Sequence, residues 1–160
     1  MQAIGVYTGT AAYSAFNRAV RTGRNIYGTS FKFHILHFLL ASALQKLKKA
    51  DSGICYTTYR RSAMKFKIMQ KKMRFGSFAS SSLQPGMTLF GQETCFKIET
   101  CHGAAVEQYS AYPAEREVLI PPYEVFTFVK RKVAELRDCR TIYVLKSAGT
   151  HSNLDCNLVK

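Results

Sequence analysis

Residues 115–124 read Glu115-Arg-Glu-Val-Leu-Ile-Pro-Pro-Tyr-Glu124. The carboxylates of Glu115 and Glu117 lead into an apolar run that a pair of prolines ends. On a strand or an extended loop, residues two apart point to the same side, so both carboxylates can face one cleft while Arg116 points elsewhere. A Glu-x-Glu pattern is more often a solvated charged face, and the stretch alone does not choose between these interpretations.

Segments rich in β-branched and aromatic residues predict strands around this stretch. They are residues 54–60, 73–78, 94–100, 125–129 and 141–145. Turn residues separate them at positions 84–86, 102–103 and 121–122. Upstream, apolar spacings of three and four predict helices over about Tyr13–Arg21 and Ser30–Lys49. The sequence therefore predicts an α+β fold, with N-terminal helices followed by a mostly antiparallel β-sheet core.

The length and charge of the chain limit the number of domains and the classes of ligand that we expect. The chain has 160 residues, 47% of them hydrophobic, so we expect a single domain over residues 1–160. A net charge of +13 attracts polyanions, anionic membrane surfaces and phosphate-bearing ligands alike. The longest apolar run, His34–Leu44, is about half of a membrane span. We see neither a secretory signal at Met1 nor a lipid-anchor tail after Lys160.

Two further polar motifs lie at or beside predicted strands, Tyr59-Arg60 and the serine run Ser80-Ser-Ser82. An arginine in a strand is more often an ion-pair or edge residue, and a serine run is usually a solvated loop. The five cysteines show no CxxC spacing, and His102 is the only histidine next to one of them, so no metal site is expected.

Taken together and in this order, the motifs resemble those of the vertebrate ecto-ADP-ribosyltransferase family. Its arginine, serine and glutamate signature matches Tyr59-Arg60, Phe75–Leu83 and Glu115–Pro122, of which the last is the most specific. The resemblance covers nearly the whole chain and includes Ala3-Ile4 with Tyr7-Thr8, Phe33–Leu40 and Asn157–Lys160. It implies the fold of that family and a mono-ADP-ribosyltransferase activity. Such an enzyme moves ADP-ribose from NAD to arginine side chains of proteins, releases nicotinamide and uses no metal.

For the NAD donor, the resemblance implies that Arg60 contacts the phosphates and that Glu117 is the catalytic carboxylate. Ser80, with Ser82 as its neighbour, would fix the nicotinamide ribose. The chemistry asks for these residue types, because a guanidinium fork matches phosphate oxygens and a carboxylate stabilises the positive charge that forms on the ribose. Ser80 and Ser82 share one parity, so both hydroxyls can line the cleft while Ser81 turns away.

For the acceptor, the resemblance implies that Glu115 selects arginine. A protein guanidinium has a pKa above about 12, so a second carboxylate has to orient it and take its proton. Tyr7 and Ser110 match lesser positions of the family's NAD site, and Phe90 is a candidate aromatic wall for the nicotinamide. The implied partners are NAD and proteins with exposed arginine, and we expect no specific nucleic acid.

The resemblance also implies a disulfide between Cys55 and Cys101, which would join the arginine strand to its neighbour. Cys156 matches a family cysteine whose partner lies upstream of Met1. We therefore expect the chain to lack the family's signal peptide and the N-terminal part of its domain. Family members are secreted or membrane-anchored, which predicts a secreted or cell-surface location.

Arg61 departs from the family, which has glycine after the arginine. We expect this side chain to lie near the nicotinamide and to hinder NAD binding. Alternatively, strand alternation turns Arg61 outward, where it supplies a second phosphate contact.

Two rival functions remain open. One is a catalytically inactive ADP-ribosyltransferase-like fold, and the other is a basic nucleic-acid-binding module using Lys65–Arg74, a run that otherwise forms a solvated strand face.

Overall fold

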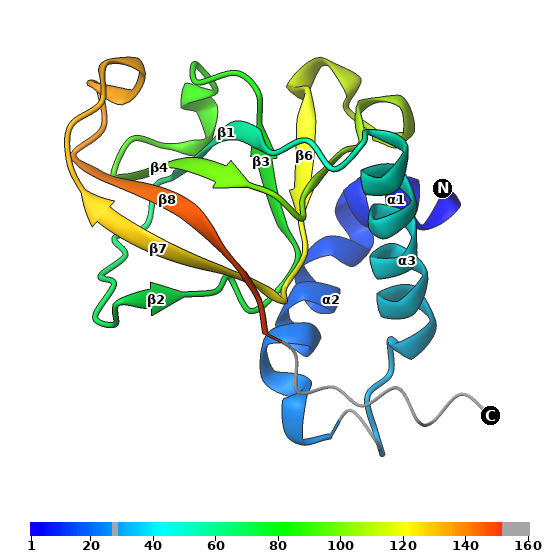
Figure 1. Cartoon of the computed structure of the whole chain (residues 1–160). Helices are drawn as coiled ribbons and strands as arrows, with labels where there is room; N and C mark the ends of the chain where they lie inside the picture. Colours follow the sequence, from blue (N-terminus) through cyan, green and yellow to red (C-terminus); the bar gives the residue numbers. More distant parts are fainter. Residues whose placement is uncertain (27–28, 152–160) are drawn as a thin grey trace.

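Helices form the first part of the molecule. The computed structural model describes residues 1–26 and 29–151, with only the backbone described at residues 10–12 and 24. The helices are α1 (Gln2–Thr8), α2 (Thr10–Thr22) and α3 (His34–Ala50), and a short 3₁₀ turn, η1 (Gly23–Asn25), follows α2. Figure 1 shows the three helices packed side by side at one end of the sheet.

The rest of the described chain forms a sheet with the strand order β2-β7-β8-β4-β1-β3-β6-β5. Neighbouring strands are antiparallel except β4 and β8, which are parallel. The predicted α+β fold with a mostly antiparallel sheet is therefore confirmed. The strands are β1 (Tyr56–Ser62), β2 (Lys72–Met73), β3 (Ala79–Ser82), β4 (Thr94–Thr100), β5 (Ala104–Ala105), β6 (Glu117–Ile120), β7 (Glu124–Lys130) and β8 (Thr141–Thr150). Short 3₁₀ turns lie in the connections: η2 (Thr88–Phe90), η3 (Glu107–Tyr109), η4 (Pro113–Glu115) and η5 (Ala134–Leu136).

The helices share one hydrophobic cluster with the near end of the sheet. Leu40 and Leu44 of α3 are fully buried there against Phe16 of α2 and Leu119 of β6. Because residues four apart lie on one helix face, this burial explains the apolar spacing seen in the sequence. A second cluster lies under β4, β7 and β8. The predicted helices are confirmed, although α3 begins at His34 instead of Ser30.

The strand predicted over residues 73–78 is wrong. β2 ends at Met73, and Gly76 has a φ of 71°, a left-handed conformation that breaks an extended run. Phe75 packs in the second cluster against Phe126, whereas Phe78 packs in the helix cluster against Phe16. The left-handed Gly76 turns the chain between these two aromatic anchors and ends the extended run.

The serine run forms one of the strands that the sequence did not predict, as do Ala104–Ala105 (β5) and Glu117–Ile120 (β6). Residues 79–82 form β3 between β1 and β6, and Ser81 donates a hydrogen bond to the carbonyl of Val118 (2.9 Å). The run of Lys65–Arg74, expected as a solvated strand face, is strand only at Lys72–Met73. The rest of that basic run follows the surface without regular structure.

Two disulfides join neighbouring parts of the sheet. Cys55, before β1, is bonded to Cys101, after β4, which is the pair that the family resemblance implied. A second bond, Cys95–Cys139, was not foreseen, because cysteine spacing does not determine connectivity. Cys156 lies outside the described residues. No helix in the described part of the chain has the length and apolar character to cross a membrane.

Candidate active site

Glu117 is a buried carboxylate at the first position of β6. The residue is only 5% exposed, and Ser110 donates a hydrogen bond to Oε2 (3.2 Å). Burial raises the pKa of Glu117 and the charge of Glu115 adds to the rise, whereas hydrogen bonds from Ser80 and Ser110 and the charge of Arg60 oppose it. These groups therefore lie close enough to affect one another.

Arg60 approaches the same place from β1. Its Nη1 donates to the carbonyl oxygen of Ser80 (2.6 Å), which ties the guanidinium to β3. Among the residues that the structure describes, the other guanidinium nitrogens of Arg60 have no hydrogen-bond partner. A guanidinium carries five N–H groups in a planar fork, so donors remain for an anion such as a diphosphate. The structure thus brings Arg60, Ser80 and Glu117 together.

The loop between β5 and β6 is held by α1. The backbone N–H of Ala111 donates to Thr8 Oγ1 (2.9 Å), and the N–H of Tyr112 donates to Ser110 Oγ (3.1 Å). Ser110 in turn donates to Glu117. The helix end therefore positions the hydroxyl that contacts the buried carboxylate.

Glu115 is placed by a turn, not by strand alternation. It is the last residue of η4, and Arg116 follows in a left-handed conformation (φ 46°, ψ 52°). Ser82 Oγ donates to the carbonyl oxygen of Glu115 (2.6 Å) and accepts from the N–H of Gln84 (2.9 Å). The expectation that Glu115 and Glu117 lie on one extended segment is wrong. The Ser82 hydroxyl, which was expected to line the cleft, bonds to these two backbone groups. Glu115 is half-buried and its charge still reaches Glu117.

Tyr7 lies beneath this group of residues. It is fully buried, its hydroxyl donates to the carbonyl oxygen of Phe78 (3.0 Å), and Asn17 Nδ2 donates to that hydroxyl (2.9 Å). Burial is the main cause that raises the pKa of Tyr7, and the charge of Glu117 contributes. Tyr7 therefore supports the site from the interior.

Phe90 is at the surface, on η2 between β3 and β4. The residue is 45% exposed. The next residue, Gly91, has a φ of 119°, and a Cβ there would lie 2.2 Å from the backbone nitrogen of Ala63. Only glycine allows the backbone at residue 91 to come this close to Ala63, which follows β1. The end of η2 therefore packs directly against the end of β1.

Arg61 points away from Arg60. In the β1–β4 pairing Arg60 lies opposite Phe96 and Arg61 lies opposite Cys95, so the two side chains leave opposite faces of the sheet. Arg61 Nη1 and Nη2 donate to the two carboxylate oxygens of Asp138 (2.7 and 3.0 Å). The expectation that Arg61 obstructs the nicotinamide is therefore wrong, and the inactive-fold alternative loses the residue that supported it.

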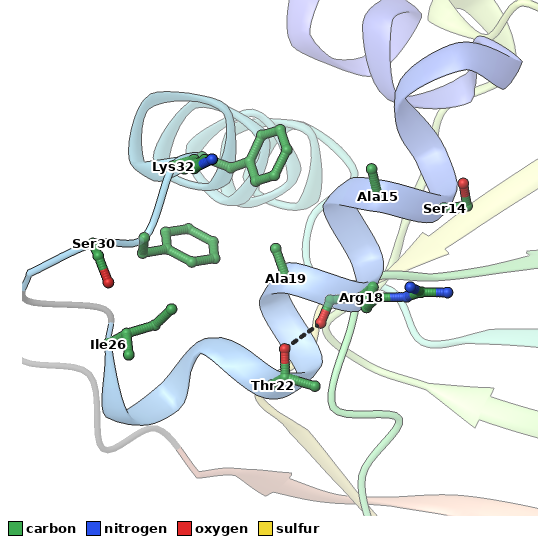
Figure 2. Close-up of a pocket in the computed structure, with 10 residues that line it drawn as sticks. Ser14, Ala15, Arg18, Ala19, Thr22, Ile26, Ser30 and Lys32 are labelled. Carbon is green, nitrogen blue, oxygen red and sulfur yellow. Dashed lines mark hydrogen bonds between the residues drawn. The ribbon is translucent and has the colours of Figure 1, made fainter.

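A cavity of about 490 Å³ lies elsewhere, between α2 and the chain before α3 (Figure 2). None of the residues that line it belongs to the group around Glu117. They are Ser14, Ala15, Arg18, Ala19, Thr22, Ile26, Ser30, Phe31, Lys32 and Phe33. Within residues 1–26 and 29–151, no three His, Cys, Asp or Glu side chains gather where they could hold a metal ion.

Helices on one end of a mostly antiparallel sheet, with an arginine on β1, a serine on β3 and a glutamate at the start of β6, define a protein of the ADP-ribosyltransferase class. The model of the family NAD:arginine ADP-ribosyltransferase matches residues 1–153. The chain belongs to this family.

Individual relatives agree. The chain is 40% identical over 168 residues to NAD(P)(+)-arginine ADP-ribosyltransferase 2 of Gallus gallus, which covers 99% of this chain and 53% of the relative. It is 38% identical over 165 residues to ecto-ADP-ribosyltransferase 5 of Homo sapiens, covering 94% of this chain and 56% of the relative. The chain thus spans about half the length of these curated relatives.

A solved structure shows the same fold. A mutant of the eukaryotic mono-ADP-ribosyltransferase ART2.2 in complex with NAD superimposes with a TM-score of 0.81 and 32% identity, covering 98% of this chain and 68% of that one.

Proposed function

We propose that this chain carries the catalytic core of a mono-ADP-ribosyltransferase that moves ADP-ribose from NAD to arginine side chains of proteins. The observation that carries the proposal is the burial of Glu117 among the hydroxyls of Ser80 and Ser110, beside the charges of Arg60 and Glu115. We further propose that residues 1–160 act as one catalytic domain.

Arg60, Ser80 and Glu117 serve the donor. NAD supplies a diphosphate and a ribose whose nicotinamide leaves with the electrons of the broken C–N bond. Arg60 binds the diphosphate through the N–H groups that Ser80 does not use, and the Ser80 hydroxyl fixes the ribose. The Glu117 carboxylate, held in a position of low solvent access, stabilises the positive charge on the ribose as the bond breaks. Phe90 supplies an aromatic surface for the nicotinamide ring.

Glu115 serves the acceptor. A guanidinium nitrogen of the target arginine forms the new C–N bond to the ribose, and the proton that this nitrogen loses goes to the Glu115 carboxylate. Glu115 is half-buried at the end of a turn, so a side chain of another protein can reach it. Tyr7 and Ser110 act indirectly, through the packing beneath the site and the hydrogen bond to Glu117.

The proposed place of action is outside the cell, as a secreted or surface protein. Relatives are named ecto-ADP-ribosyltransferase and GPI-linked NAD(P)(+)-arginine ADP-ribosyltransferase. The two disulfides of this chain are typical of an oxidising compartment. Its proposed macromolecular partners are proteins with exposed arginine.

The test uses the full chain, produced with its disulfides oxidised and incubated with NAD, with and without a small guanidino compound such as agmatine. We expect nicotinamide release in both samples and an ADP-ribosylated guanidine in the second, detected by mass spectrometry. NAD binding without nicotinamide release would support the inactive alternative. ADP-ribose appearing on lysine and not on the guanidine would overturn the acceptor assignment.

A further inference from the structure

Arg61 is buried in a network that the proposed catalytic chemistry does not use. Its side chain is 3% exposed, and its guanidinium meets the Asp138 carboxylate at both oxygens. In addition, Nε donates to the carbonyl oxygen of Pro85 (2.7 Å). One guanidinium therefore joins the segment after β3 to the segment before β8.

Asp138 also holds the other end of the η2 segment. Gln92 Nε2 donates to Asp138 Oδ2 (3.0 Å), and the carbonyl oxygen of Gln92 accepts from the backbone N–H of Arg140 (2.9 Å). Pro85 and Gln92 mark the two ends of the segment that contains η2. The Arg61–Asp138 pair thus fastens this segment at both ends.

The disulfide Cys95–Cys139 holds the Asp138 carboxylate near Arg61. Cys139, next to Asp138, is bonded to Cys95, and Cys95 is the residue opposite Arg61 in the β1–β4 pairing. A buried charge is costly unless it is paired and hydrogen-bonded, and here the covalent link sets the partner across the sheet. Both components of the pair are therefore held in position before any ligand arrives.

The tip of the fastened segment is exposed. Leu89 is 77% exposed and Phe90 is 45% exposed, so the tip of η2 gains little from packing against the rest of the molecule. Its position depends on its two ends, on the close approach at Gly91 and on the hydrogen bonds of its own turn, such as Gly91 N–H to Thr88 O (2.9 Å).

We propose that Arg61 and Asp138 form a clamp that sets the position of η2 and, through the Phe90 ring, the affinity of the site for NAD. Arg61 is thus a positioning residue that acts from the opposite face of β1 to Arg60. The proposal rests on the proposed function, because it takes Phe90 as part of the NAD site.

The test compares Arg61→Met with Lys97→Met. Lys97 forms an ion pair with Glu135 of η5 (2.6 Å), so Lys97→Met removes a neighbouring ion pair without touching the η2 segment. We expect Arg61→Met to raise the Kd and KM for NAD about tenfold, the value of one or two hydrogen bonds of a charged group, with a smaller change in kcat. Lys97→Met should leave both constants unchanged. Unchanged NAD affinity in Arg61→Met would overturn the proposal.

A double variant separates positioning from a general loss of structure. If the clamp acts through Phe90, the effect of Arg61→Met on the NAD Kd should largely disappear in the Phe90→Ala background. Independent, multiplicative effects would show that Arg61 acts by another route. If Arg61→Met fails to fold, Asp138→Ala carries the same test, because the Asp138 side chain is 34% exposed. This variant leaves the buried Arg61 charge unpaired, so its thermal unfolding curve is measured beside the NAD Kd.

Hydrogen exchange provides a readout that needs no ligand. The amides of Phe90 and Gly91 are hydrogen-bonded within the turn. We expect faster exchange there in Asp138→Ala and none of that acceleration in Lys97→Met. If the wild-type chain does not bind NAD, the proposed function fails, whereas unaltered exchange in Asp138→Ala contradicts the clamp itself.

Discussion

Glu117 and Glu115 stand two residues apart and have opposite surroundings. Glu117 opens a strand that is paired on both sides, is 5% exposed and accepts a hydrogen bond from Ser110. Glu115 ends a 3₁₀ turn, is half-buried, and is followed by the left-handed Arg116. Glu117 therefore belongs to the sheet, whereas Glu115 lies on the turn that precedes β6.

This difference suits the two halves of the proposed reaction. A carboxylate that stabilises charge at the moment of bond cleavage acts more strongly where water is excluded and its partners are fixed. A carboxylate that receives the side chain of another protein has to be reachable from outside. We therefore expect Glu117 to govern every reaction of NAD and Glu115 to govern transfer alone.

The largest effect should come from Glu117→Gln. We expect nicotinamide release and ADP-ribose transfer both to fall by at least about 100-fold, because the amide keeps the shape and loses the charge. NAD affinity and thermal stability should be preserved, since the substitution removes a buried charge. Kinetics with NAD alone and with an arginine acceptor, together with a thermal unfolding curve, test this. A variant that keeps more than about a tenth of the wild-type rate would remove Glu117 from the catalytic role.

The next effect, on transfer alone, belongs to Glu115→Gln. ADP-ribosylation of a guanidine should fall by about 10- to 100-fold, the usual range for a general base, while nicotinamide release in the absence of an acceptor stays within about twofold. The assay measures both products of the same enzyme preparation. Equal losses of both activities would assign Glu115 to the donor site.

A smaller effect should follow from loosening the turn beneath Glu115. Ser82→Ala removes the hydroxyl that holds the Glu115 carbonyl, and we expect transfer to fall by about threefold to tenfold with little change in hydrolysis. Ser81→Ala is the matched control, because Ser81 is buried in the same strand and bonds to Val118 instead. A larger transfer defect in Ser81→Ala than in Ser82→Ala would contradict this reading of the turn.

The smallest effect concerns pH. Burial holds the pKa of Glu117 above its ordinary value, so acidification should protonate it, and stop the reaction, at a higher pH than for an exposed glutamate. The hydrogen bond from Ser110 lowers that pKa. Ser110→Ala should therefore move the acid limb of the kcat/KM profile to higher pH and leave activity at pH 8 within about twofold. Ser110→Thr, which retains a hydroxyl, serves as the control, and a limb that moves to lower pH would contradict the assignment.

The helices α2 and α3 and most long strands could be predicted from the sequence, because their apolar patterns match what they bury, whereas the short α1 (Gln2–Thr8) was not predicted. α3 turns Leu40 and Leu44 into the core at helical spacing, and β4 and β8 contain the β-branched and aromatic residues that strands favour. The short β3 could not be predicted. Serines are polar and do not indicate a buried strand. Here the hydroxyls of Ser81 and Ser82 donate to the carbonyl oxygens of Val118 and Glu115, and these hydrogen bonds offset the cost of burial.

The identities of the candidate site residues were inferred from motifs, whereas the positions of their side chains could not be inferred in this way. The alternation of side chains along a strand correctly predicts that Arg60 and Arg61 point to opposite faces of the sheet. Nothing in the sequence, however, identifies Asp138 as the partner of Arg61. For Glu115, the same alternation failed because a 3₁₀ turn and a left-handed residue intervene. A turn that depends on the distant Ser82 cannot be seen in local sequence.

The most direct test of the division between Glu117 and Glu115 is the partition of NAD between hydrolysis and transfer, measured in one assay for the wild-type chain, Glu117→Gln and Glu115→Gln. Total nicotinamide release reports the donor side, and the fraction of ADP-ribose found on the guanidine reports the acceptor side. We expect Glu117→Gln to lower the total and keep the fraction, and Glu115→Gln to lower the fraction and keep the hydrolysis measured without acceptor. A Glu117→Gln variant that keeps the total and changes the fraction would contradict the account.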